Sequence, residues 1–155
     1  MALEATFRSL SVCLHHLHDA LNELQATLGD KPLDDESALA DGLETTVLDL
    51  MGTLHEAMRA ALDAQNGVDH PPDLDRARRA LALCQERFRH IEQQFAADLA
   101  SYEKLKELAR RGNERQAWLA WSSTVKQRIE QCRQPLAQTS AALAACWQEL
   151  ASKVS

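Results

Sequence analysis

Apolar residues repeat without a break through the first 28 residues of the chain, alternately four and three positions apart. They are Leu3, Phe7, Leu10, Leu14, Leu17, Leu21, Leu24 and Leu28. This spacing places all of them on one face of an α-helix, and a seven-residue apolar repeat is typical of helices that pack side by side as in a coiled coil. Gly29 and the nearby Pro32 then end the predicted helix. Such a helix has to bury its apolar face against other helices.

Three further segments carry the same pattern, so the sequence predicts helices over about 3–28, 35–65, 73–111 and 114–153. Asn66 and Gly67 end the second of these, and Asp73 is a predicted N-cap of the third. Asp98 interrupts the third pattern; it either pairs with a basic group of a facing helix, lines a polar pocket or turns outward. Pro135 predicts a kink in the fourth helix near residues 131–133, unless two shorter helices meet there.

The expected architecture is an all-α, antiparallel four-helix bundle with up-down-up-down topology and heptad packing like that of a coiled coil. No segment alternates apolar and polar residues as a strand would, and short connections make consecutive helices antiparallel. The 155 residues are enough for one domain with its own core, so residues 1–155 are taken as a single domain. At 1.5 Å per residue the first two helices span roughly 40 to 45 Å and the last two roughly 60 Å. The second hairpin is therefore longer, and its end, residues 102–123, is expected to project; we call this segment the tip.

The tip contains five basic residues and two of the three tryptophans in the chain. These candidate partner-binding residues are Lys104, Lys106, Arg110, Arg111, Arg115, Trp118 and Trp121. Arginine and tryptophan are enriched among the residues that dominate protein interfaces. The alternative is that the basic residues form a solvated surface while the rings pack inside the hairpin or in a dimer, since aromatic residues at helical spacing usually belong to a core.

Charge is distributed unequally along the chain, whose net charge is −6. Residues 1–75 carry three basic and fifteen acidic side chains, a net −12, whereas residues 76–155 carry fourteen and eight, a net +6. We expect the two halves to pair within one bundle or across a dimer, with an external partner as the alternative. Pairing with the acidic second helix also explains a series of basic residues in the third helix, for which phosphate binding is the weaker alternative: Arg76, Arg78, Arg79, Arg87, Arg89 and His90.

The sequence carries no motif that indicates an enzyme or a cofactor. It has no glycine-rich phosphate loop, no HExxH and no GxSxG, and no glutamate is followed three positions later by histidine as a di-iron centre requires. His15, His18 and Asp19 share one helical face and are weak candidate metal ligands. Because two or three surface ligands on one helix are usually only solvated, no metal is predicted.

The four cysteines, Cys13, Cys84, Cys132 and Cys146, lack CxxC spacing and lie within helical patterns. They are interpreted as small, reduced residues, with the last three facing the core. The chain shows no signal-peptide pattern and no apolar run of about 18 residues, so a cytoplasmic protein without membrane contact is expected.

The leading functional hypothesis is a non-catalytic cytoplasmic module for protein–protein interaction, acting as an adaptor, a scaffold or a homodimer. The first alternative is a nucleic-acid-associated accessory subunit that uses the basic C-terminal half, which predicts steep salt dependence. The second alternative is a bundle that senses a metal or a small molecule. No small-molecule substrate is evident.

Overall fold

The computed structural model describes residues 2–30, 37–69, 73–109 and 115–154, and side chains at 3–30, 42–69, 73–97 and 116–153. Four helices account for nearly all of them: α1 (Ala2–Gly29), α2 (Ser37–Val68), α3 (Leu74–Ala109) and α4 (Arg115–Val154). No strand occurs in these ranges. Within the same ranges, none of the helices has an apolar stretch long enough to cross a lipid bilayer. The predicted all-α four-helix bundle is therefore confirmed.

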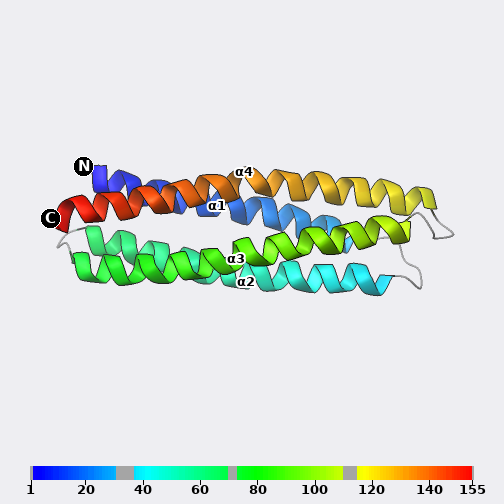
Figure 1. Ribbon diagram of the computed structural model, residues 1–155, viewed down its shortest axis with the longest axis horizontal. Coiled ribbons are helices and arrows are strands. Elements are labelled where there is room, and N and C mark those ends of the chain that lie inside the picture. The colour runs from blue at the N-terminus through cyan, green and yellow to red at the C-terminus, as the bar shows by residue number, and fades with distance from the viewer. Residues whose placement is uncertain (1, 31–36, 70–72, 110–114, 155) are drawn as a thin grey trace.

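Each helix runs antiparallel to the next one along the chain, which gives the predicted up-down-up-down topology (Figure 1). α1 contacts α2 and α4, and α3 also contacts α2 and α4, so α1 and α3 lie diagonally opposite each other. The start of α1 and the end of α4 lie at the same end of the bundle, and the end of α3 and the start of α4 lie at the other end.

The helices contain 28, 32, 36 and 40 residues, so the second hairpin is longer than the first, as predicted. At 1.5 Å per residue these lengths correspond to about 42, 48, 54 and 60 Å. α3 and α4 reach further along the bundle than α1 and α2 at the end where α1 finishes (Figure 1).

The core consists of the residues that the heptad pattern selects. All eight residues of the first pattern, from Leu3 to Leu28, are buried, with at most 7% of their surface exposed. Full burial of one such side chain contributes about 1.5–3 kcal/mol. Two polar residues of α4 share the core, and their hydroxyls donate to carbonyls of the preceding turn: Thr139 to Pro135 at 2.7 Å and Ser122 to Leu119 at 3.1 Å.

Small residues line α2 near its C-terminal end. Its buried positions there are Ala57, Ala60, Ala61, Ala64, Gly67 and Val68. A Cβ atom placed on Gly67 would lie 2.9 Å from the backbone nitrogen of Ala77 in α3, so the two backbones nearly touch. α2 runs through Asn66 and Gly67 and ends at Val68, one residue beyond the predicted end. The missing side chain of Gly67 lets α3 approach at this point.

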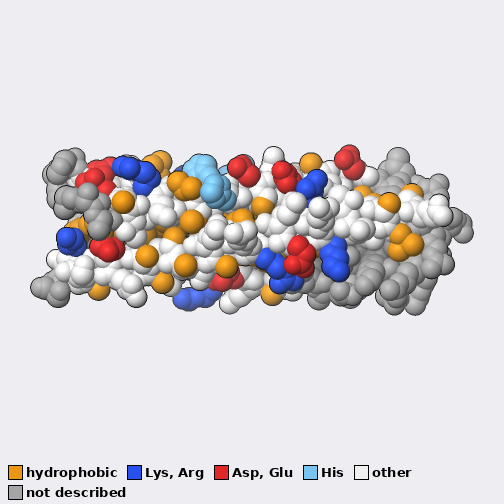
Figure 2. Space-filling model, turned by 90° about the horizontal axis from the view of Figure 1, so that it is seen from above, with side chains coloured by type: hydrophobic (Ala, Val, Ile, Leu, Met, Phe, Trp, Pro, Cys, Tyr) orange, Lys and Arg blue, Asp and Glu red, His pale blue; other side chains and the backbone are white. Residues whose placement is uncertain are grey.

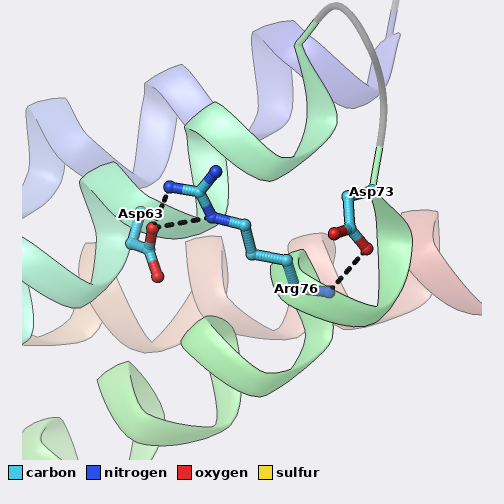
Figure 3. A network of polar contacts seen from close by, with 3 residues as sticks. All are labelled: Asp63, Asp73 and Arg76. Atoms are coloured by element: carbon cyan, nitrogen blue, oxygen red, sulfur yellow. Dashed lines mark hydrogen bonds and ion pairs between the residues drawn. The ribbon is translucent and has the colours of Figure 1, made fainter.

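The start of α3 is held by Asp73, which confirms the predicted N-cap (Figure 3). The carboxylate of Asp73 accepts a hydrogen bond from the backbone N–H of Arg76 at 3.1 Å, and the N–H of Asp73 donates to the carbonyl of Gly67 at 2.6 Å. The guanidinium of Arg76 reaches back to Asp63 of α2, with Nε 2.9 Å from Oδ1. One short segment thus ties the first turn of α3 to the last turns of α2.

α4 runs as one helix through Pro135, so the alternative of two shorter helices is wrong. Asp98 lies in α3, but its side chain is outside the described part of the molecule, and the alternatives for it remain open.

Candidate functional site

The two tryptophans of the tip are buried at the end of the bundle. Trp118 is 3% exposed and Trp121 7% exposed, and their rings meet edge to face with centroids 5.4 Å apart. The indole N–H of Trp121 donates a hydrogen bond to the carbonyl of Thr27 at 2.8 Å. Thr27 lies in the last turn of α1, and its carbonyl also accepts a hydrogen bond from the backbone N–H of Asp30 at 3.2 Å. Of the two interpretations left by the sequence, the structure shows the buried one: these rings fasten α4 to the end of α1.

For the basic residues of the tip, the structure describes at most the backbone. Lys104 and Lys106 belong to α3 and Arg115 begins α4, but the side chains of all three lie outside the described part of the molecule. Arg110 and Arg111 lie outside the described residues altogether. In α4, six residues precede Trp121, which corresponds to about 9 Å of helix. The proposed role of these five residues in binding therefore stays a prediction.

Several arginines of the basic half pair with acidic residues of the first half. Arg87 Nε lies 2.8 Å from Glu56 Oε2, and the pair joins α3 to α2 as the Arg76–Asp63 pair does. Arg128 of α4 lies 3.6 Å from Glu23 of α1. Exposed pairs of this kind contribute about 0–1 kcal/mol each, so their main effect is on the register and choice of neighbouring helices. For these arginines the expected pairing between the two halves is confirmed.

An open groove of about 410 Å³ lies between α2 and α3. Its lining residues are Glu56, Arg59, Ala60, Asp63, Leu83 and Arg87. Glu56, Asp63 and Arg87 already take part in the ion pairs described above, which leaves Arg59, Ala60 and the 43% exposed Leu83 as the groove residues outside those pairs. The groove is open to the surface rather than an enclosed binding pocket.

Three cysteines face the core, as the heptad positions predict: Cys84, Cys132 and Cys146. Burial raises the pKa of each of these thiols to about 12. Neighbouring charge adds to the shift in the pKa of Cys132, through Glu23, and of Cys146, through nearby thiols and then Glu149. A thiol with so high a pKa is almost fully protonated at neutral pH and is a poor nucleophile. These cysteines therefore fill space in the core.

One histidine of α1, His18, lies beside a histidine of α2 that the sequence did not indicate as its neighbour. His15 Nδ1 lies 2.8 Å from the carbonyl oxygen of Ser11, and His18 Nδ1 lies 3.7 Å from Asp19. The ring of His18 instead meets that of His55 on α2, with centroids 5.1 Å apart and planes tilted by 38°. Figure 2 shows histidine side chains gathered at one place on the surface.

The candidate ligands His15, His18 and Asp19 do not form a site of three ligands. Within the described ranges, no three His, Cys, Asp or Glu side chains come together in a way that could hold a metal ion. The sequence missed the partner of His18 because a position on α2 is brought beside α1 only by the register of the helix pair. An alignment of the two heptad patterns in antiparallel register could have indicated it.

No known protein family, no curated protein sequence and no solved structure matches this chain.

Proposed function

We propose that this chain is a non-catalytic helical module of the cytoplasm that binds a protein partner or a second copy of itself through the end formed by α3 and α4. The observation that carries the proposal is the inequality of the two hairpins. Because α3 and α4 reach beyond α1 and α2, the last turns of α3 and the first turns of α4 have fewer neighbouring helices beside them (Figure 1). The reduced, buried cysteines are in keeping with a reducing compartment.

The chemistry of the tip favours a partner with an acidic surface. Residues 102–123 contain five basic and three acidic side chains, whereas the chain as a whole has a net charge of −6. Positive charge on one part of an acidic protein steers association with a negative surface and selects partners by charge. Trp118 and Trp121 are buried, so their part in this proposal is to hold the tip against α1 rather than to touch the partner.

Charge reversal in the tip tests the proposal. Lys106→Glu and Arg111→Glu should abolish self-association in light scattering, or abolish capture of the partner identified by mass spectrometry on the immobilised chain. Arg89→Glu is the matched control, because Arg89 is an exposed arginine of α3 outside the tip. If the wild-type chain is monomeric and captures nothing, or if the tip variants behave as Arg89→Glu does, the proposal is wrong.

A nucleic-acid-associated role is the second candidate, and the basic tip is the observation that favours it. The arginines paired with Asp63, Glu56 and Glu23 count against it, because their charge is already matched within the molecule. A gel shift with short single- and double-stranded DNA and RNA at low salt separates the two candidates. Binding that weakens steeply as salt rises and disappears in Arg111→Glu would support the nucleic-acid role.

A further inference from the structure

His18 and His55 bring two imidazole rings together across the contact between α1 and α2. The ring centroids are 5.1 Å apart, and the planes are tilted by 38°. His18 is partly exposed, with 28% of its side-chain surface open, and His55 is exposed. The two rings are therefore near each other and within reach of ions in solution.

We propose that His18 and His55 form a surface site for a divalent transition-metal ion such as Zn²⁺, with water completing the coordination. The spacing of the rings carries this proposal. A zinc–imidazole nitrogen bond of about 2.0–2.1 Å places the ring centroid roughly 3.2 Å from the ion, so two imidazoles at the tetrahedral angle have centroids roughly 5.2 Å apart. The observed 5.1 Å matches this separation.

The chemistry of the pair selects the class of ion. Two neutral imidazoles favour borderline ions such as Zn²⁺, Ni²⁺ and Cu²⁺ over Mg²⁺ or Ca²⁺, which prefer oxygen ligands. The carboxylate of Asp19 lies on the Nδ1 side of His18, at 3.7 Å, which leaves Nε2 for the ion. At this distance the carboxylate makes no hydrogen bond to the ring, but its negative charge favours a cation nearby.

The site has a consequence that a pair of ligands on one helix would not have. Because the two histidines come from different helices, a bound ion links α1 to α2 and stabilises the folded bundle relative to the unfolded chain. If His15, His18 and Asp19 alone held the ion, replacing His55 would not change the affinity for it. The dependence on both helices is therefore the property to measure.

The experiment is a titration of the untagged full-length chain with ZnCl₂ at pH 7.5 by isothermal calorimetry, with MgCl₂ in parallel. We expect one Zn²⁺ per chain and no heat from Mg²⁺. His18→Gln and His55→Gln should each weaken the affinity at least about tenfold, since losing even a residue that only orients a metal ligand costs about 10- to 100-fold. His16→Gln is the matched control, because His16 is also an exposed histidine of α1. It should bind as the wild type does.

Thermal unfolding provides the second measurement. Zn²⁺ should raise the melting temperature of the wild type and of His16→Gln, and at the same Zn²⁺ concentration should raise that of His55→Gln less. The far-ultraviolet circular dichroism of each variant without metal checks that its helices are intact. Absence of stoichiometric Zn²⁺ binding, equal affinity in His55→Gln and wild type, or equal loss in His16→Gln and His18→Gln would overturn the proposal.

Discussion

Replacing Gly67 with alanine adds one methyl group where α2 and α3 almost touch. The new Cβ atom would lie 2.9 Å from the backbone nitrogen of Ala77, 3.0 Å from its Cα and 3.1 Å from its Cβ. Two of these atoms belong to the backbone of α3, so no side chain can rotate away to make room. α3 itself has to shift, and that shift also disturbs the hydrogen bond from the N–H of Asp73 to the carbonyl of Gly67.

The magnitude follows from two opposing effects. Alanine in place of glycine inside a helix contributes about 0.5–1 kcal/mol, less near a helix end. Forcing an extra methyl group into a filled contact costs about 1–3 kcal/mol. We expect Gly67→Ala to lower the free energy of unfolding by about 1–2 kcal/mol. Gly52 of α2 is the matched control, because a Cβ atom there would have no neighbour within 4 Å. Gly52→Ala should raise the free energy of unfolding by about 0.5–1 kcal/mol.

Urea denaturation followed by circular dichroism at 222 nm measures both values. In a chain of this size a change of 1 kcal/mol moves the melting temperature by about 2–4 °C, so thermal scans give an independent check. The two variants should move in opposite directions. If Gly67→Ala is as stable as Gly52→Ala, the close approach of α2 and α3 at Ala77 is not present in the protein and the reasoning fails.

Three further predictions concern the reactivity of the cysteines, the hydrogen bond of Trp121 and the burial of two leucines. At pH 8, iodoacetamide should modify the native chain at no site other than the half-buried Cys13, because burial raises the pKa of the three core thiols to about 12, whereas the chain in urea should react at all four. Trp121→Phe should lower the free energy of unfolding by about 1 kcal/mol through loss of the hydrogen bond to Thr27, and a variant as stable as wild type in urea would argue against that bond. Leu14→Ala should cost about 2–5 kcal/mol, while Leu62→Ala, at a position 53% exposed, should change stability by less than about 0.5 kcal/mol; equal effects in the same urea assay would contradict the assigned burial.

The architecture could be predicted from the sequence because each helix carries its own signal. The spacing from Leu3 to Leu28 identifies a buried face without reference to any other segment, and every residue of that series is buried. The N-cap at Asp73 could be predicted for the same reason, since a cap acts on the turn that follows it. Signals of this kind are local, and local signals are available in a single sequence.

Features that depend on the pairing of two helices could not be predicted in this way. Glycine is a common signal for a helix end, and the close contact of Gly67 with Ala77 can be recognised only when α2 and α3 are placed side by side. The contact of His18 with His55 likewise depends on the register between α1 and α2. The burial of the two tryptophans could not be predicted, because a ring in the first turns of α4 can face either solvent or the end of a neighbouring helix. Trp121 faces the neighbour because Thr27 offers a carbonyl in the last turn of α1.

The even number of helices returns the chain to the end of the bundle from which it started (Figure 1). Attachment through the start of α1 and attachment through the end of α4 therefore orient the molecule in the same way, with the tip directed away from the support. A chain immobilised on a sensor surface or fused to a carrier at either end presents residues 102–123 to the solution. Measurements made in these two formats should agree for any partner of the tip. They should differ for a partner that docks at the opposite end, where α1 begins and α4 ends.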